Sequence, residues 1–356
     1  MEHDLTVWKS LSLALGFSLV AAAAAGGQSA LRSPWDEHPV KLTYAPYACP
    51  QPIHLTADLT TNGFYGDAKS SIIDPVKWKA YEESAGPVKK LGILAVAAAD
   101  AYLATGSRQA AACVLMLEKT AAQDKALTGK MSSHQAYYVQ GWVEGALAIA
   151  LLKVRPSGAI SDADQKLLTD WMKAVSTQTM GYYDREVAQA PGHVGNNHLY
   201  WAGVQVAAVA IAVGDPKLLG WAAEAYRNGS RQITPDSTLP LEMRRGQRAL
   251  HYHLYAIAPL VYLAEFGELN GIHLYAENDF AIRRLVTRSV AGLEGSGYFD
   301  QQTGIKQDLP DGAPPSAEAI SWTRVYLHRF PDARLAALLA RAPSLGYMYL
   351  GGLPPY

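Results

Sequence analysis

The sequence is a succession of apolar, alanine-rich segments of helical length, separated by short breaks at Gly, Pro or Asn. No stretch alternates apolar and polar residues for long enough to build a sheet. Short connections make sequential helices antiparallel neighbours. We therefore predict an all-α fold, a curved stack of helical hairpins with a concave inner face. The predicted helices cover residues 90–105, 108–120, 133–154, 167–175, 197–213, 217–231, 244–269 and 279–293, with two weaker ones from Ser316 and Asp332.

Composition narrows the range of functions. The 31 basic and 32 acidic residues nearly cancel, which argues against a protein that binds nucleic acid through a basic surface. Hydrophobic residues make up 49% of the chain and permit a sizeable core. The 20 Tyr and 8 Trp greatly outnumber the 6 Phe. Because Tyr and Trp carry a polar group on the ring, this excess is typical of a wet surface or groove.

The N-terminus resembles a secretory signal. Residues 11–25 are apolar and end in small residues, a run too short for a comfortable membrane span. Acidic neighbours offset Lys9, so the positive start of the signal is weak, and an uncleaved anchor or an apolar helix is the alternative. We predict a signal peptide over 1–25, a single domain over 26–356, and a periplasmic or secreted protein without membrane contact after cleavage.

Export would place the two cysteines, Cys49 and Cys113, where they can form a disulfide. In an oxidising compartment two cysteines can pair, and such a bridge typically stabilises a fold by about 2–4 kcal/mol. Two unrelated buried thiols are the alternative, because sequence does not show geometry. Two cysteines are too few for a Cys-rich zinc site.

The first candidate functional segment is Gly195–Trp201, which opens a predicted helix. Backbone N–H groups at a helix start are free to meet an anion. Asn197 and Trp201 lie four apart on one helical face, and His198 lies three before Trp201. The alternative is an Asn cap followed by a core His and Trp.

The second candidate segment, residues 244–255, is rich in Arg, His and Tyr. Its candidate residues are Arg244, Arg245, Arg248, His251 and Tyr255. On a helix Arg248 and Tyr255 share a face, since they lie seven apart. His251 and His253 lie two apart and diverge, so they do not form a helical zinc pair. Arginines interleaved with His and Tyr favour an acidic ligand, and a solvated basic face is the alternative.

The third candidate segment is the loop 62–70 in the region before the first helix. Gly63 and Gly66 flank an aromatic pair that includes Tyr65, and Lys69 adds a positive charge. This pattern suits a flap over a groove. An ordinary surface loop is the alternative.

Cationic groups, His and Tyr without paired carboxylates fit the β-elimination of a uronate polymer. The sugar carboxylate must be neutralised, a base must remove the carbon-5 proton, and an acid must protonate the departing oxygen. Asn and Arg donors supply about 3–4 kcal/mol each when well aimed, and His or Tyr supply about 10²–10⁴-fold each. A free Tyr titrates near about 10, so we expect Arg248 to lower the pKa of Tyr255.

The segments NNHLYW, RRGQRALHYHLY and GFYGDAKS together resemble polysaccharide lyase family 5. That family contains alginate lyases acting on poly(β-D-mannuronate), with relatives that cleave glucuronate polymers. The resemblance runs from about Cys49 to the region of Asp308. It implies an incomplete (α/α) toroid, or α/α barrel, of helical hairpins with a substrate groove. It also implies a monomeric lyase that acts on an acidic polysaccharide without metal or cofactor.

The resemblance assigns roles to single positions. Asn197 neutralises the substrate carboxylate, with Arg248 as its cationic helper. His198 assists or serves as base. Tyr255 is the acid and also a candidate base, so the choice of base stays open. Cys49 and Cys113 match cysteines that pair in relatives. The residues expected to contact substrate are Tyr65 and Lys69 in the lid loop, Tyr138 as an aromatic wall, and Trp201, Arg244, Arg245 and His251.

Two other function classes stay open. A non-catalytic polyuronate-binding protein, or a scaffold of exopolysaccharide export, would keep the groove without turnover. A glycoside hydrolase would need two carboxylates flanking the bond, and Asp184 and Glu242 lie near the motifs without forming a convincing pair. Leu199 and Leu254 replace polar residues that are usual in mannuronate-specific members, so mannuronate and glucuronate both stay open as substrates.

Overall fold

The computed structural model describes residues 30–37, 40–309 and 314–356. Within these ranges the regular secondary structure is helical and no β-strand is formed, as predicted. The predicted signal peptide lies outside the described residues. No helix in this part of the chain is both long and apolar enough to cross a membrane.

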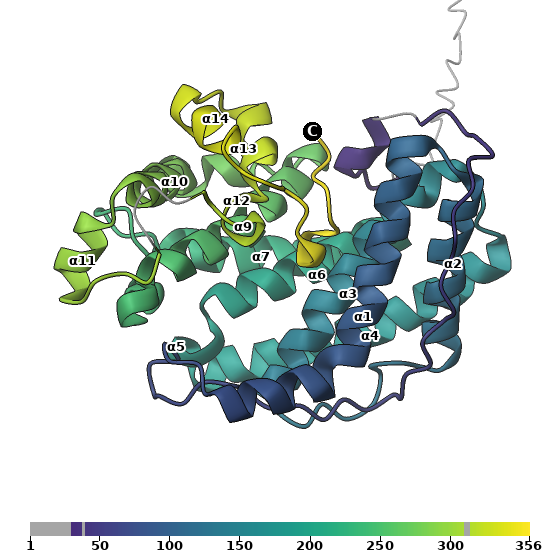
Figure 1. Cartoon of the computed structure of the whole chain (residues 1–356), viewed down its shortest axis with the longest axis horizontal. Coiled ribbons are helices and arrows are strands. Elements are labelled where there is room, and N and C mark those ends of the chain that lie inside the picture. The colour runs from purple at the N-terminus through teal and green to yellow at the C-terminus, as the bar shows by residue number, and fades with distance from the viewer. Residues whose placement is uncertain (1–29, 38–39, 310–313) are drawn as a thin grey trace, which may run out of the picture. The chain divides into compact units, whose positions relative to one another are not determined.

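The helices follow one another with short connections (Figure 1). The α-helices are α1 (Pro75–Thr105), α2 (Arg108–Gln123), α3 (His134–Val154), α4 (Asp162–Gln189), α5 (Pro191–Val194), α6 (Asn197–Val213), α7 (Pro216–Gln232), α8 (Pro240–Met243), α9 (Ala249–Leu269), α10 (Glu277–Glu294), α11 (Gly297–Thr303), α12 (Ala317–Ile320), α13 (Thr323–Arg329) and α14 (Ala333–Leu339). The 3₁₀ turns are η1 (Pro34–Glu37), η2 (Arg155–Ser157), η3 (Gly246–Arg248), η4 (Leu274–Ala276) and η5 (Met348–Leu350).

Several predicted boundaries are wrong. The first helix begins at Pro75 rather than at residue 90, and α4 runs from Asp162 to Gln189 rather than from residue 167 to 175. In α1 charged residues on the exposed face interrupt the apolar run that the prediction followed, and in α4 the uncharged polar residues 176–179 do so. The predicted helix from Arg244 begins instead at Ala249, because the turn η3 precedes it.

The long helices pack as hairpins in two layers. The inner helices α1, α3, α6 and α9 pack against one another in that order. Each is followed in the chain by an outer helix, and α2, α4, α7 and α10 pack behind the inner row. This alternation of inner and outer helices is the architecture of an incomplete (α/α) toroid, and it confirms the predicted fold class.

The inner position of a helix follows from its residues. Every residue of α6 from Leu199 to Ile211 is buried, because the segment is apolar or small except for Gln205, whose amide donates to Glu144 and Thr179. Gly145 of α3 lets α6 approach closely, since a Cβ there would lie 3.2 Å from the Cα of Gln205. The outer helix α7 buries only one side, from Leu218 to Ser230, and exposes charged residues on the other.

Side-chain caps determine where several helices begin. The hydroxyls of Ser107, Ser133 and Ser161 accept backbone N–H groups at the starts of α2, α3 and α4. The side chain of Asn196 accepts the N–H of His198 at the start of α6. Such a cap is worth about 1 kcal/mol. The Asn196 cap therefore holds His198 in the first turn of α6.

The segment before α1 is tied to α2. Cys49 and Cys113 form a disulfide with their Cα atoms 5.5 Å apart and a sequence separation of 64, as predicted. Further along, the carboxylate of Asp124 accepts the backbone N–H of Leu55 at 3.2 Å. These contacts hold the chain that leads into the loop 62–70.

Candidate active site

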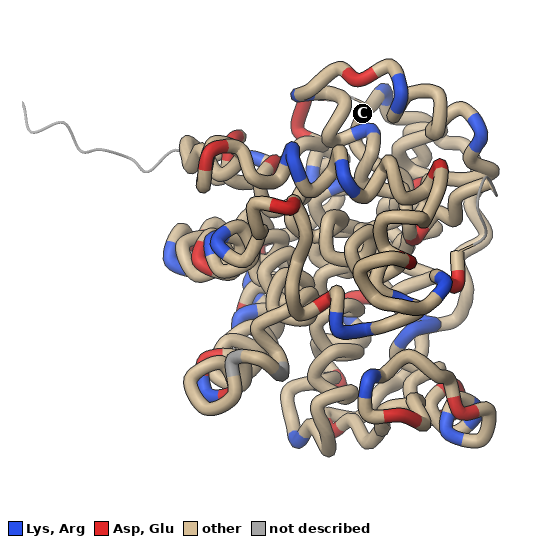
Figure 2. The backbone as a smooth tube through the Cα atoms, turned by 90° about the vertical axis from the view of Figure 1, so that its left-hand side faces the viewer, with Lys and Arg blue, Asp and Glu red and all other residues tan. Residues whose placement is uncertain are grey.

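A cleft of about 750 Å³ opens beside the inner helices. Its wall comes from the loop 63–73, from α1, α3 and the start of α6, from residues 241–255, from α12 and from the turn around η5. The charged residues that line it are Lys69, Lys89, Arg244, Arg245 and Arg248 against Asp67 and Glu318. Over the chain as a whole, basic and acidic residues are interspersed (Figure 2). The cationic excess is thus local to the cleft, which suits an anionic ligand in a protein with net charge −1.

Most of the predicted site residues meet in this cleft. Those that line it are Tyr65, Lys69, Tyr138, His198, Arg244, Arg245, Arg248, His251 and Tyr255. Asn197 and Trp201 do not line it. Four segments far apart in the sequence therefore converge, because α1, which follows the loop, and α3, α6 and α9 are successive neighbours in the inner row.

His198 lies flat against the aromatic wall predicted for the cleft. Its ring stacks on Tyr138 with 3.7 Å between centroids and an interplanar angle of 10°. Trp142 lies one turn further along α3, with its ring 6.4 Å from His198. Burial raises the pKa of Tyr138 above its ordinary value, so this tyrosine keeps its proton and serves as a wall.

Tyr255 lies at the bottom of the cleft. It is 7% exposed, and its ring lies 4.9 Å from that of Trp201. Burial raises its pKa well above the ordinary value, and the neighbouring Tyr347 and Glu318 raise it further. The expected lowering of this pKa by Arg248 is therefore wrong in direction. Tyr255 holds a proton and is suited to donate it.

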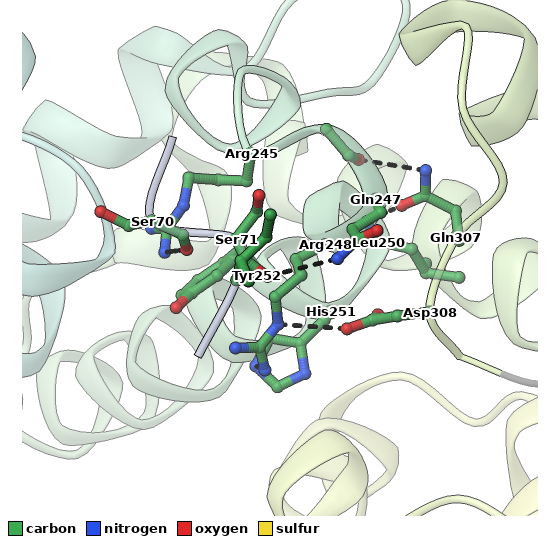
Figure 3. A network of polar contacts seen from close by, with 12 residues as sticks. Ser70, Ser71, Arg245, Gln247, Arg248, Leu250, His251, Tyr252, Gln307 and Asp308 are labelled. Atoms are coloured by element: carbon green, nitrogen blue, oxygen red, sulfur yellow. Dashed lines mark hydrogen bonds and ion pairs between the residues drawn. The ribbon is translucent and has the colours of Figure 1, made fainter. Parts of the chain in front are cut away.

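Arg248 lies beside His251 and Asp308 (Figure 3) and also contacts Tyr65. Its Nη1 donates to the Tyr65 hydroxyl at 2.8 Å, and its Nε lies 3.2 Å from Asp308 Oδ2. Its Nη2 lies 3.0 Å from His251 Nε2. Since arginine only donates, His251 Nε2 is the acceptor. Burial, and then Arg248 and Arg245, lower the pKa of His251 to about 3, so this histidine is neutral.

Arg245 holds the lid loop in place. Its Nε donates to the Lys69 carbonyl at 3.0 Å and its Nη2 to the Ser70 carbonyl at 2.7 Å (Figure 3). Its guanidinium lies 3.4 Å from the centre of the Tyr252 ring, whose hydroxyl makes a short hydrogen bond with Tyr65. The lid loop therefore lies at the cleft, in the position predicted for a flap over a groove.

The lid loop also has its own internal order. The Asp67 carboxylate accepts the N–H groups of Lys69, Ser71 and Ile72. Burial opposes ionisation of this carboxyl, but the hydrogen bonds from Ile72 and Ser71 lower its pKa to about 2. Asp67 is thus ionised near neutral pH and shapes the loop rather than acting on protons.

Asn197 lies behind the cleft wall. Its side chain is fully buried, and its backbone N and its Nδ2 both donate to Glu242 Oε1. Trp201 is 3% exposed and packs beneath Tyr255, so the structure places it as a support and not on the cleft surface. Burial raises the pKa of Glu242, although Arg245 and the hydrogen bonds from Asn197 oppose the rise.

The two carboxylates considered for a hydrolase do not face each other across the cleft. Glu242 is buried against Asn197. Asp184 accepts a hydrogen bond from Trp221 Nε1 and lines a separate pocket. Within the described ranges, no group of three or more His, Cys, Asp or Glu side chains is arranged to hold a metal ion.

Several cleft residues escaped the sequence reasoning. They are Trp78, Tyr81, His134, Trp142, Glu318, Tyr347 and Tyr349. Tyr349 stacks on Trp142 with 5.0 Å between ring centres, which brings the last residues of the chain against α3. The one available signal was the tyrosine excess, to which Tyr347 and Tyr349 contribute.

Known proteins are similar to this chain in sequence and in fold. The family model for alginate lyase matches residues 58–299. A polysaccharide lyase of Stenotrophomonas maltophilia is 35% identical over 301 residues, covering 83% of this chain and 86% of that protein. An alginate lyase of Pseudomonas putida is 31% identical over 270 residues, covering 74% of this chain and 71% of that protein.

Solved structures extend this similarity to the fold. Alginate lyase A1-III, in a complex with a tetrasaccharide, superposes with a TM-score of 0.74 at 21% identity, covering 90% of this chain and 88% of that one. A second structure of this enzyme, from Sphingomonas species A1, gives a TM-score of 0.70 over 90% of this chain and 89% of that one. With the family model, the relatives and the toroid in agreement, the chain belongs to the alginate lyase family of polysaccharide lyases.

Proposed function

We propose that this enzyme cleaves 4-linked uronate polymers by β-elimination in the described cleft, without a metal or cofactor, and releases unsaturated oligosaccharides. The observation that carries the proposal is the meeting of a proton-holding Tyr255, the stacked His198 and the Arg248 guanidinium in one cationic cleft. These are the groups that an elimination next to a carboxylate requires.

Neutralisation of the substrate carboxylate is assigned to Arg248 and Asn197. Arg248 lines the cleft and carries a permanent charge. Asn197 is fully buried behind the cleft wall and its amide donates to Glu242, so its assignment to the substrate carboxylate requires this wall to shift when the polymer binds. Each well-placed donor of this kind contributes about 3–4 kcal/mol to the transition state.

The proton steps are assigned to His198 as base and Tyr255 as acid. A phenolate at Tyr255 is disfavoured by burial and by Glu318, so this residue suits proton donation to the departing oxygen. His198 lines the same cleft and is held flat by Tyr138, which orients its ring edge. Each proton transfer contributes about 10²–10⁴-fold to the rate.

Polymannuronate is the first substrate to expect, because several relatives are named alginate lyases. The departures Leu199 and Leu254 bear little on this choice. Both side chains are buried and neither lines the cleft, so they touch no bound sugar directly. Glucuronate polymers are tested beside polymannuronate because the charged wall recognises the carboxylate, which both polymers carry.

The test uses purified polymannuronate and polyglucuronate and follows the ultraviolet absorbance of the unsaturated product. We expect absorbance to rise with at least one polymer, with and without a chelator. Binding of both polymers without product would favour a non-catalytic binding protein. A rate abolished by the chelator and restored by added metal would contradict the metal-free mechanism.

We further propose that the protein is exported to the periplasm or beyond and acts as a monomer. The Cys49–Cys113 disulfide supports an oxidising compartment. Cell fractionation tests the location, and recovery of the protein only in the cytoplasmic fraction would contradict it. Size-exclusion chromatography tests the oligomeric state.

A further inference from the structure

The turn 347–352 contributes two tyrosines to the wall of the cleft. Tyr347 and Tyr349 both line it, and each is half-buried, so part of each ring remains exposed. The turn is closed by backbone hydrogen bonds, because the N–H of Tyr347 donates to the Gly352 carbonyl and the N–H of Gly352 donates to the Tyr347 carbonyl. The two rings therefore reach the cleft on one compact unit, and whatever holds the turn also determines where the rings lie.

A buried lysine lies beneath this turn. Lys153, near the end of α3, is fully buried. Its ammonium group donates to Asp100 Oδ1 at 2.5 Å, to the Gly351 carbonyl, and to the Leu353 carbonyl at 3.0 Å. A lysine ammonium has three N–H donors, so each of them has an acceptor here. One acceptor belongs to the turn, and another directly follows it.

Asp100 of α1 holds the same turn through a second contact. Its Oδ1 forms the ion pair with Lys153, and its Oδ2 accepts the backbone N–H of Leu353 at 3.0 Å. Glycines allow this close approach, with φ of +75° at Gly351 and +91° at Gly352. A Cβ at Gly351 would lie 2.1 Å from a side-chain carbon of α3, and one at Gly352 would lie 2.2 Å from Asp100 Oδ2. The turn thus fits closely between α1 and α3.

Stability alone is a poor reason for this buried ion pair. Taking two charges out of water is unfavourable, and their mutual attraction offsets that cost only in part. Apolar side chains of similar volume often stabilise a fold as well or better. An apolar side chain, however, cannot donate directional hydrogen bonds to the carbonyls of Gly351 and Leu353. Lys153 therefore provides the position of the turn, which an apolar replacement would leave undetermined.

We propose that Lys153 and Asp100 are positioning residues for substrate binding. They clamp the turn 347–352 so that its two tyrosines face the bound polymer. Neither Lys153 nor Asp100 lines the cleft, so they act only through the turn. The tyrosine rings offer apolar faces to the C–H groups of a sugar and hydroxyls to its oxygens. The inference rests on the proposed function, because it takes the ligand of the cleft to be a uronate polymer.

Hydrogen exchange tests the clamp itself. Lys153→Met removes the ammonium group and retains an apolar side chain of similar length. Exchange at Leu350 and Gly352, whose N–H groups donate to Tyr347 within the turn, should accelerate by about tenfold or more. Exchange in the outer helix α7 should keep the wild-type rate. Equal acceleration in the turn and in α7 would indicate general destabilisation and would overturn the clamp.

Steady-state kinetics test the effect on substrate binding, with polymannuronate or polyglucuronate, whichever the wild type cleaves. Lys153→Met should raise KM by about two- to tenfold, the range expected when aromatic contacts with a ligand are lost. It should leave kcat within about twofold, because contacts made equally in the ground state and the transition state affect KM alone. Each variant is assayed well below its melting temperature. A fall in kcat with an unchanged KM would contradict the inference.

Gly351→Ala displaces the same turn without removing a charge, because its Cβ would overlap a side chain of α3. It should raise KM as Lys153→Met does, and it provides the same test if Lys153→Met does not fold. Tyr349→Ala removes one ring directly and should also raise KM. If Lys153 acts through this ring, combining Lys153→Met with Tyr349→Ala should raise KM by less than the product of the two single effects.

Lys119→Met is the matched control. Lys119 of α2 pairs with Asp164 of α4 at 2.7 Å, and neither residue lines the cleft. The same replacement therefore removes a lysine–aspartate pair between helices without touching the turn 347–352. Both KM and the exchange of the turn amides should stay at their wild-type values.

Wild-type KM values in both Lys153→Met and Gly351→Ala, despite faster exchange in the turn, would overturn the role in substrate binding and leave the lyase function intact. A raised KM in Lys119→Met equal to that in Lys153→Met would also overturn it, because any lost ion pair would then suffice. A wild-type enzyme that neither binds nor cleaves either polymer would instead overturn the proposed function, and the role in substrate binding with it.

Discussion

Glu242 Oε1 accepts two hydrogen bonds from Asn197, one from the backbone N at 3.0 Å and one from Nδ2 at 2.9 Å. Both side chains are fully buried. One carboxylate thus holds the first residue of α6 and orients the amide that we assign to the substrate carboxylate. Glu242, which forms no convincing hydrolase pair with Asp184 in the sequence, is thus a positioning residue for Asn197.

Glu242→Ala should therefore damage both stability and turnover. It leaves two buried N–H groups without an acceptor, which costs about 1–3 kcal/mol. It also frees the Asn197 amide, so kcat should fall more than KM rises. Glu242→Gln retains an acceptor oxygen and should keep most of both properties. Urea denaturation and steady-state kinetics measure these effects, and wild-type values for Glu242→Ala would rule out the positioning role.

Tyr255→Phe removes the acid but conserves the ring. Packing against Trp201 at 4.9 Å persists, so the melting temperature should stay near that of the wild type. Without the hydroxyl the departing oxygen must leave unprotonated, and we expect kcat to fall by about 10²–10⁴-fold. The unsaturated-product assay measures this loss. Near-normal turnover would show that another group is the acid.

The disulfide should matter for stability and not for the chemistry. Cys49 and Cys113 lie outside the cleft lining and close a long loop. Replacing both with Ser should lower the free energy of unfolding by about 2–4 kcal/mol. Activity well below the melting temperature should be unchanged. Treatment of the wild type with a reductant should give the same loss, and a reductant effect on the double variant would point to another cause.

Glu118 of α2 should make stability depend on pH. It is fully buried, and neither carboxylate oxygen has a hydrogen-bond partner among the described residues. Burial raises its pKa well above the ordinary value. The folded state therefore holds this proton above the unfolded pKa of about 4, and stability falls as pH rises toward the folded pKa, by at most about 1.4 kcal/mol per pH unit.

Glu118→Gln removes this titration. Its advantage over the wild type in urea denaturation should grow from acidic toward neutral pH. Glu83→Gln is a suitable comparison, because Glu83 is exposed on α1. Parallel stability curves for Glu118→Gln and the wild type would show that Glu118 is ionised in the folded protein.

The helix α6 could be predicted well because the signals that define it lie within its own segment of the sequence. The bounds predicted for α6, residues 197–213, match the structure, since an Asn cap, an unbroken apolar run and a closing Gly all lie within one segment. Where a helix has a charged exposed face, as in the first half of α1, the same method misses it. The contrast between inner α6 and outer α7 follows from the sequence, because α6 is apolar on nearly every side and α7 on only one.

The site could be predicted only where motifs are continuous in the sequence. His198, Arg248 and Tyr255 were found because each belongs to such a segment. Glu318 and Tyr347 line the cleft only through the return of the C-terminal chain, and no local pattern encodes that placement. The burial of Trp201 beneath Tyr255 could not be predicted either. Helical spacing shows which residues share a face with Trp201, but not which part of the fold packs on that face.

Arg245 offers a test of how the lid loop is held. Its guanidinium donates to the carbonyls of Lys69 and Ser70 and lies over the Tyr252 ring. Lysine cannot reproduce this fork or its stacking. Arg245→Lys should therefore loosen the lid loop and raise KM. Because two hydrogen bonds worth about 1 kcal/mol each are weakened, kcat/KM should fall by about tenfold.

Arg244→Lys is the matched control for Arg245→Lys, since Arg244 lines the same cleft but is exposed and makes no ion pair with any described residue. Hydrogen exchange of the loop amides separates the two variants. Exchange at Ser71 and Ile72 should accelerate in Arg245→Lys and stay at the wild-type rate in Arg244→Lys. Equal exchange in both variants would mean that Asp67, which accepts those two amides, holds the loop without help from Arg245.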